Sequence, residues 1–293
     1  MSDKSIVYFS KKITPESLVT VYEAMGWQPC GKVAVKLSTG EPPASNYLRP
    51  ALIKDLVQKV QGTIVECNVA YPSARAKAGR HLKVAKDHGF TDIAPVEIQD
   101  AMGTMDLPVT GGVHLKRDIV GKSFADYDSY LILSHFKGHP MAGYGGAIKN
   151  ISIGLGSSKG KCLIHSGGRS TLTIFGGKQD EFLESMAEAG KAVSDYLGHG
   201  ERIAYVNVMN NLSVDCDCNG RPHPPKMLDV GVLASLDPVA LDQACLDLVY
   251  AQKDADGREL VKRIESRNGL HTLEHAVKMG LGSRDYELVN LDK

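Results

Sequence analysis

"YLILSHFKGHPMAGYGGAIKN", residues 130–150, joins a short apolar run to a loop rich in glycine, histidine and lysine. The run at 130–134 is typical of a buried strand, because it is short, apolar and followed by polar residues. The same pattern occurs elsewhere in the chain, in KVAVKLS (32–38), GTIVECN (62–68), IAYVNVM (203–209) and DVGVLAS (229–235). The sequence therefore predicts several buried strands, one of which leads directly into this loop.

Helical patterns lie between the predicted strands. In LRPALIKDLVQKV (48–60) the apolar residues are spaced as on one face of a helix, and ARAKAGRHLKVAKDHG (74–89) follows. QDEFLESMAEAGKAVSDYLG (179–198) ends at a glycine suited to a helix C-terminus, and DPVALDQACLDLVYAQ (237–252) opens with an N-capping aspartate and a proline. This alternation predicts an α/β fold with a largely parallel sheet flanked by helices.

The predicted fold leaves room for two α/β lobes with a cleft between them. The segment 101–118 is glycine-rich and irregular, and we expect it to form a lid or a crossing between lobes, with the changeover near 101–135. A chain of 293 residues with 43% hydrophobic content is large enough for either arrangement.

Charge and hydropathy exclude some kinds of partner. Lys plus Arg and Asp plus Glu both number 34, so the chain lacks the excess positive charge that general nucleic-acid binding requires. It contains no apolar run of the roughly 20 residues that span a bilayer, and no cleavable signal pattern. We expect a cytoplasmic protein with no nucleic-acid or membrane partner, and the balanced charge is compatible with a homodimer.

The loop after residue 134 has the composition of a binding site. Ligands of parallel α/β sheets collect at the carboxyl ends of strands, and the loop's glycines (Gly138, Gly143, Gly145, Gly146) would let backbone amides approach an anion. Lys149 is expected near a helix start, where free amides also favour negative charge. His135 and His139 could donate to an anion, bind a metal or move a proton, although Pro140 and the glycines argue against a continuous helix that would align them. The alternative is a glycine-rich turn whose histidine only caps a strand.

A second candidate is VDCDCNGRPHPPKMLD, residues 214–229, which is too polar and proline-rich for core. Cys216, Cys218 and His223, with Asp215 and Asp217, suit a soft or borderline transition metal such as zinc, iron or nickel. Two cysteines one residue apart cannot complete a tetrahedral site, so further ligands would come from elsewhere in the fold. The alternative is a pair of ordinary loop thiols.

Other polar residues follow predicted strands. Asn68, Tyr71 and Arg75 come after the strand at 62–68 and could bind a carboxylate or phosphate. Similar groups follow the strand at 32–38: Ser45, Asn46 and Arg49. In the helix at 237–252, Asp237 is explained by capping, whereas Asp242 could face the same cleft or be a solvated helix-face carboxylate.

Several of these segments resemble one family. The resemblance is carried by NYLRPALIKDLV, by the arginine and His81 in ARAKAGRHLKVAKDHGF, and by LSHFKGHPMAGYGGAIKNISIG, KCLIHS, DCDC and DVGVLASLDPVALDQACLD. Together they look like the family named domain of unknown function 362, whose members are often labelled iron–sulfur centre proteins. The resemblance runs over nearly the whole chain, so residues 1–293 are expected to be a single family unit.

The chain departs from this family in one respect. Many relatives carry a ferredoxin-like stretch with CxxCxxC runs after the His-Ser motif, but His165 and Ser166 are followed here by GGRSTLTIFGGKQDEF, with no cysteine before 216. We therefore expect no ferredoxin-type cluster. A fainter similarity is to the lactate-racemase-type family, which implies a glycine–lysine turn and histidines around a nickel-pincer nucleotide. Here GGAIK ends at Lys149, with His139 before it and His165 after it.

These observations lead to two classes of hypothesis. The first is an enzyme that uses a transition metal or metal-bearing cofactor on a small anionic substrate, a racemase-like enzyme being one variant. The second is a non-catalytic metal or iron–sulfur carrier, which predicts exposed thiols in a shallow site. A structural relic that binds nothing is a third option. For the enzyme, the expected catalytic residues are His135, His139, Lys149 and His165; the expected metal ligands are Cys216, Cys218 and His139; and the expected cofactor-binding residues are Gly143, Gly145, Gly146, Lys149, Asn150, Arg75 and Asn46.

Overall fold

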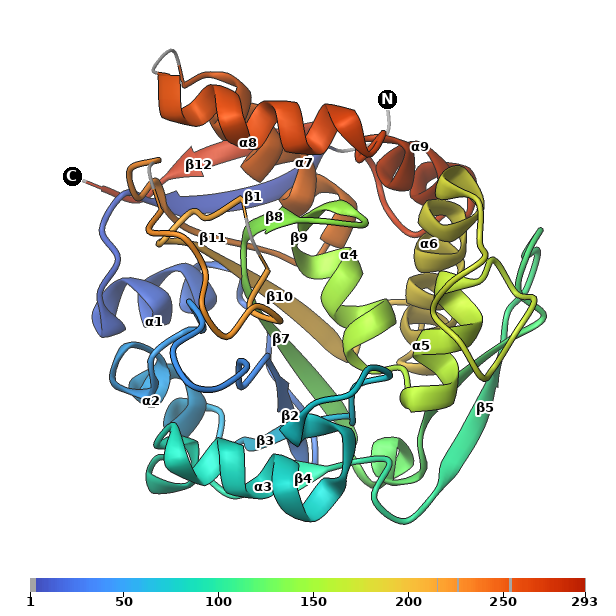
Figure 1. Ribbon diagram of the computed structural model, residues 1–293. Helices are drawn as coiled ribbons and strands as arrows, with labels where there is room; N and C mark the ends of the chain where they lie inside the picture. The colour runs from blue at the N-terminus through green and yellow to red at the C-terminus, as the bar shows by residue number, and fades with distance from the viewer. Residues whose placement is uncertain (1–3, 215, 226, 253–254, 293) are drawn as a thin grey trace.

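A largely parallel eight-stranded sheet forms the centre of the molecule (Figure 1). The computed structural model describes residues 4–292 apart from 215, 226, 253 and 254, with residues 255 and 256 described only in the backbone. The strands follow one another across the sheet in the order β12 (Tyr286–Asn290), β1 (Ser5–Ser10), β11 (Gly231–Ser235), β10 (Ile203–Met209), β7 (Ser129–His135), β2 (Val33–Lys36), β3 (Thr63–Glu66) and β4 (Val96–Ile98). Only β11 runs antiparallel to its neighbours within this sheet. The predicted α/β class and largely parallel sheet are confirmed.

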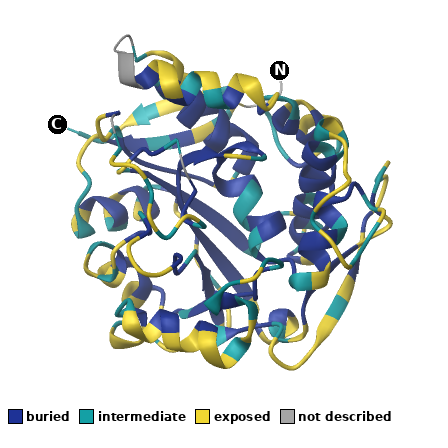
Figure 2. Cartoon of the chain, in the orientation of Figure 1, coloured by how far each residue is buried: buried dark blue, intermediate teal, exposed yellow. Residues whose placement is uncertain are grey.

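Both faces of the sheet are apolar because helices cover both of them. Along β7, Tyr130 and Ile132 pack into one core while Leu131 and Leu133 pack into the other, the alternation expected of a strand. Figure 2 shows the central strands buried and the exposed residues gathered on the outer surfaces of the helices.

The helices form a layer on each side of the sheet. One layer consists of α1 (Pro15–Ala24), α2 (Pro50–Lys59) and α3 (Ala78–Asp87), together with the short turns η1 (Ala74–Ala76) and η2 (Phe90–Asp92). The other consists of α4 (Ala147–Lys149), the π-helical η4 (Asn150–Gly154), α5 (Ser158–His165), α6 (Gln179–Tyr196), α7 (Pro238–Tyr250) and α9 (His271–Lys278). The helix α8 (Ala255–Ser266) packs against the small hairpin of β8 (Lys137–His139) and β9 (Gly143–Gly145).

Two helix ends confirm the predicted caps. The side chain of Asp237 accepts hydrogen bonds from the backbone N–H groups of Val239 and Ala240, and Pro238 is the first residue of α7. Gly198 follows α6 with a φ of 75°, a left-handed conformation that glycine adopts at low cost.

The segment 101–118 is more regular than its composition suggests. It contributes β5 (Thr104–Pro108) and the start of β6 (Arg117–Gly121), which pair as an antiparallel hairpin, and the short turn η3 (Lys122–Asp126) comes after it. The buried carboxylate of Glu188 on α6 anchors the tip of the hairpin by accepting backbone N–H groups from Val113, His114 and Leu115. The expectation of an irregular segment was wrong: β5 alternates exposed and covered residues as a strand does, but only one of its five residues is fully buried, so it gives no apolar run. The division into two lobes stays a prediction.

The described residues include no helix with the length and apolar character needed to cross a bilayer.

Candidate functional site

A cavity of about 210 Å³ lies where β2, β3 and β7 end. Its wall is completed by the β8–β9 hairpin, by α4 and α5, and by the loop that carries the two neighbouring cysteines. Most of the residues chosen from the sequence line this one space: His135, His139, Gly145, Gly146, Lys149, Asn150, His165, Arg75, Cys216 and Cys218. The strand-end loops therefore do converge, although the roles assigned to these residues stay predictions.

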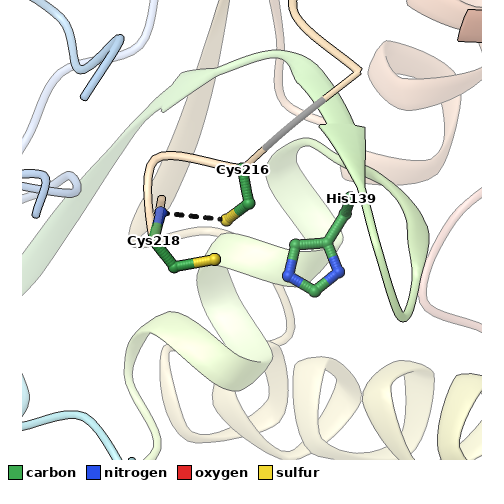
Figure 3. A group of neighbouring side chains, drawn as sticks. All are labelled: His139, Cys216 and Cys218. Atoms are coloured by element: carbon green, nitrogen blue, oxygen red, sulfur yellow. Dashed lines mark hydrogen bonds between the residues drawn. The ribbon is translucent and has the colours of Figure 1, made fainter. Parts of the chain in front are cut away.

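Three of the lining side chains form a group of potential metal donors (Figure 3). The sulfur atoms of Cys216 and Cys218 and a ring nitrogen of His139 all lie within 4.8 Å of one another. The Nδ1 atom of His139 accepts backbone N–H groups from Met141 (3.2 Å) and Ala142 (3.0 Å). The neutral ring therefore carries its hydrogen on Nε2, on the side of the two sulfur atoms.

The two cysteines differ in acidity. A hydrogen bond from the thiol of Cys218, followed by the influence of His139 and Lys149, holds the pKa of Cys216 well below its usual value, although burial opposes this. The backbone N–H of Cys218 also donates to the Cys216 sulfur at 3.4 Å. The pKa of Cys218 is raised by its hydrogen bond to Cys216 and by burial. Cys216 is thus the more acidic of the two, and burial lowers the pKa of His139 to about 4.

This donor set fits a transition metal. Two sulfurs and one imidazole nitrogen are ligands that zinc, iron and nickel accept. Within the described residues the group has no fourth histidine, cysteine or carboxylate member, so a bound metal would keep a coordination position for another molecule. Asp215, which the sequence placed beside these cysteines, lies outside the described residues.

Asp217 fixes the cysteine loop to the sheet. Its buried carboxylate accepts from Nδ1 of His135 at 3.0 Å and from Nζ of Lys137 at 2.7 Å, and its carbonyl accepts the N–H of Glu41 at 2.9 Å. Burial opposes ionisation, but His135 and Lys137 together hold the pKa of Asp217 well below its usual range. The other nitrogen of His135 donates to the Asn210 carbonyl at 2.6 Å. Both nitrogens of His135 are therefore engaged in positioning this loop, not free for proton transfer.

Lys149 has a different environment. It lies half-buried on the cavity wall, and no hydrogen bond or ion pair from any described residue reaches its ammonium group. Burial, with Lys137 and Lys36 nearby, lowers its pKa, while the Cys216 thiolate opposes this. Lys149 is the last residue of α4, where the chain changes from α- to π-helical geometry, a feature often found at functional sites.

Asp242 anchors the helix that carries Lys149. This fully buried carboxylate accepts the N–H groups of Ala147 (2.7 Å) and Ile148 (3.0 Å) and the side-chain amide of Asn207 (2.8 Å). Asp242 does not line the cavity, so the expectation that it faces the cleft was wrong, as was the solvated alternative. The first amides of α4 are occupied by this carboxylate and are not available to an anionic ligand.

Asn150 also has a positioning contact. Its amide donates to the carbonyl groups of Lys36 and Leu133, both at 3.3 Å, and to the Ser134 hydroxyl at 3.0 Å. These bonds tie the helix after the glycine-rich loop to the ends of β2 and β7. Asn150 therefore places its neighbour Lys149 over the ends of the strands.

The helix α5 supplies two further groups. Lys161 is buried and donates to the Gly156 carbonyl at 2.5 Å, and no carboxylate of the described part of the chain pairs with it. His165 donates from Nδ1 to the Lys161 carbonyl at 2.7 Å and stacks on Phe182, with ring centroids 4.6 Å apart. This leaves the lone pair of Nε2 free of described partners. Burial lowers the pKa of His165 to about 3, so its imidazole is neutral at pH 7.

A buried ion-pair network forms the opposite wall. Lys36 and Arg75 both contact Glu66, at 3.1 Å and 3.2 Å, and Arg75 also contacts Glu41 at 2.9 Å. His81 lies 3.6 Å from Glu66 on the same network. Arg75 is thus committed to two carboxylates and has little capacity left for an anionic ligand.

The sequence did not single out four of the lining ionisable residues, namely Lys36, Glu66, Lys137 and Lys161. The first two did carry a usable signal: each is a lone charged residue near the carboxyl end of an otherwise apolar strand. A charge in that position is costly unless it is paired or used at a site.

Some predicted residues lie away from the cavity. Asn46 is half-buried, with its amide nitrogen unpaired among the described residues, and Gly143 sits in β9 against Ile264 and Gly269. Arg49 stacks on Tyr47, 4.0 Å from the ring centroid. Others outside the cavity wall are Ser45, Asn68 and His223, the last of which lines a separate hollow of about 810 Å³ beside α8. The structure does not bring these residues to the cysteines, and the binding roles of Asn46 and Gly143 stay predictions.

Comparison with known proteins places the chain in a family without a stated reaction. A family model described as "Domain of unknown function (DUF362)" matches residues 33–247. No curated protein shows significant similarity to the chain. Among solved structures, the lactate racemase apoprotein from Thermoanaerobacterium thermosaccharolyticum is similar at 10% identity and a TM-score of 0.43, covering 97% of this chain and 82% of that one. A protein from Thermotoga maritima is similar at 10% identity and a TM-score of 0.45, covering 80% and 58%. These likenesses are too low to carry a function.

Proposed function

The chain belongs to the family described as Domain of unknown function (DUF362), whose name states no reaction, and from the geometry of the site we propose that it is an enzyme that uses a bound transition metal on a small anionic substrate. One observation carries this proposal. The donor group of Cys216, Cys218 and His139 shares a single small cavity with the ammonium group of Lys149, which no described residue pairs with.

The residues divide into distinct roles. Cys216, Cys218 and His139 would hold the metal, which would supply Lewis-acid or redox chemistry when bound. Coordination through Nε2 of His139 would displace the hydrogen that this nitrogen carries in the metal-free ring. Lys149 would bind an anionic group of the substrate, because its ammonium donors have no competing partner among the described residues. His165, with a free lone pair on Nε2, would accept a hydrogen bond or a proton from the substrate.

Burial of the site supports an enzyme over a carrier. A carrier predicts exposed thiols in a shallow site, whereas Cys216 is buried and Cys218 half-buried. Polar interactions are stronger in such a desolvated space than in water, so that fixed charges can act on bound substrate.

Metal analysis of anaerobically purified protein tests the proposal. We expect about one equivalent of iron, zinc or nickel in the parent protein, as three donors and an open position predict, and a large loss in the Cys216→Ser and Cys218→Ser variants. Cys30→Ser is the matched control, because Cys30 is an exposed cysteine away from the cavity. Metal content that is absent from all forms, or unchanged by both site substitutions, would contradict the metal role.

Substitution of Lys149 separates the enzyme from the carrier. Lys149→Met should keep the metal but lose affinity for small carboxylates, measured by calorimetry. Loss of metal with retained carboxylate affinity would instead favour the carrier.

A further inference from the structure

The charges around the cavity are incompletely paired. Five basic side chains line it: Lys36, Lys137, Lys149, Lys161 and Arg75. Three of them are paired with carboxylates, since Lys36 and Arg75 contact Glu66, Arg75 contacts Glu41, and Lys137 contacts Asp217. Within the described residues, the ammonium groups of Lys149 and Lys161 have no carboxylate partner.

These two lysines are held by different helices. Lys149 ends α4, which Asp242 anchors, and Lys161 projects from α5, which Ser157 caps by accepting the N–H of Gly160. Lys161 is only 7% exposed and uses a single hydrogen bond, to Gly156, so two of its three N–H donors remain for a ligand.

The lining of the cavity also includes apolar groups. Val69, Met141 and Ile153 line the same space as the two lysines and His165. Such apolar groups suit a short carbon chain. A volume of about 210 Å³ is below the roughly 300 Å³ at which pockets for drug-sized ligands begin, so we expect a small occupant.

We propose that the substrate carries two separate anionic groups, one bound by Lys149 and the other by Lys161, as in a short dicarboxylate. This inference rests on the proposed function and names its substrate class. A ligand with one carboxylate would leave one desolvated ammonium group unpaired, and an unpaired buried charge is unfavourable. Two anionic groups at opposite ends of a short chain would satisfy both lysines and place the carbons between them beside His165.

Calorimetric titration with a series of simple anions tests this assignment. Acetate and propionate carry one carboxylate, succinate and glutarate carry two, and inorganic phosphate carries its charge on a single group. A second charge-assisted contact should make a dicarboxylate bind about 10- to 100-fold more tightly than a monocarboxylate. Equal affinity for the two classes, phosphate binding as tight as that of the best dicarboxylate, or no binding of any of them would overturn the proposal.

Variants assign the second contact to its lysine. Lys161→Met should reduce dicarboxylate affinity to the monocarboxylate level while leaving monocarboxylate binding unchanged, and Lys161→Arg should keep most of the preference. Lys159→Met is the matched control, an exposed lysine on the same helix that does not line the cavity. Equal loss of both ligand classes in folded Lys161→Met, as checked by circular dichroism, would contradict the assignment.

The same titrations on metal-free protein separate this proposal from the proposed function. A dicarboxylate preference without any bound metal would leave the two-lysine site standing and remove the metal-dependent reaction. Metal binding without a dicarboxylate preference would remove the two-lysine site and leave the proposed function standing.

Discussion

At the scale of single residues, Asp118 is a buried carboxyl group with few hydrogen-bond partners among the described residues. It is fully buried on β6, one oxygen accepts the N–H of Ile119 at 2.8 Å, and the other has no partner among the described residues. Burial raises its pKa to about 7. Between pH 4 and pH 7 the folded state therefore binds more protons at this site than the unfolded state, so this residue's contribution to stability falls as the pH rises through that range.

Replacement of Asp118 by Asn should remove this cost. We expect Asp118→Asn to be more stable than the parent, and its advantage at pH 8 to exceed that at pH 5 by about 2–3 kcal/mol, because the unfolded carboxyl is ionised at both pH values whereas the folded one ionises only near pH 7. Urea unfolding at the two pH values measures the difference. Asp106→Asn, an exposed carboxylate on the neighbouring strand, is the control and should change little. A difference between parent and Asp118→Asn that is the same at both pH values would contradict the prediction.

Asp217 shows the opposite case, a buried carboxylate with strong partners. Asp217→Asn would leave Lys137 and His135 without their shared anion and should destabilise the protein by about 3–5 kcal/mol. Because the same contacts hold Cys216 and Cys218 in place, metal affinity in a chelator competition should fall about 10- to 100-fold. Asp87→Asn breaks only an exposed ion pair with Lys83 and should affect neither quantity. Unchanged metal affinity in Asp217→Asn would show that the loop does not depend on this anchor.

At the scale of elements, the sequence predicts the middle of the sheet but not its edges. The five apolar runs correspond to β11, β10, β7, β2 and β3, which lie next to one another in the sheet. The edge strand β4 is largely half-buried and β12 is mostly exposed, so their residues lack a continuous apolar run. The direction of β11 was also beyond prediction, because it depends on pairing with β1 from the other end of the chain.

The same limit applies to the site. Cysteine, histidine and lysine types identified the loops, but hydrogen-bond partners decided what each residue does. His135 and Arg75 looked as suitable as His139 and Lys149, yet Arg75 is paired with two carboxylates, and His135 contacts one carboxylate and one backbone carbonyl group. Asp217 lies 82 residues from His135 and Glu41 lies 34 residues from Arg75, so no local pattern could reveal these pairings.

The junction between β9 and α4 depends on close packing at Gly146. A Cβ atom added there would lie 2.3 Å from the Asp242 carboxylate, which caps α4. Gly146→Ala should therefore lower the free energy of unfolding by about 1–3 kcal/mol and weaken carboxylate binding, because Lys149 would shift with the helix. Gly79→Ala is the control, since a Cβ on α3 at that position meets nothing within 4 Å and alanine favours a helix. Equal stability and carboxylate affinity in Gly146→Ala and the parent would show that Asp242 can move without displacing the helix.

At the scale of the whole molecule, the cavity draws on segments from both halves of the chain, joined by one sheet. The strands β2 and β3 come before the segment 101–135, whereas β10 and β11 come after it, and all four belong to the same hydrogen-bonded sheet. The first strand, β1, pairs with both β11 and β12 near the end of the chain. The two lobes considered from the sequence would thus have to separate along the centre of a continuous sheet.

This topology predicts that the described core unfolds as one unit. Because β7 pairs with β2 on one side and with β10 on the other, neither half can lose its strands without exposing the apolar faces of the other. Differential scanning calorimetry on metal-free protein should show a single transition in which the calorimetric and van't Hoff enthalpies agree. A second transition that persists at low scan rates would contradict the single unit and support two lobes. If there are two lobes, ligands of the cavity should stabilise only the lobe that contains Lys149. If the protein unfolds as one unit, succinate at saturating concentration should raise the midpoint of the whole transition.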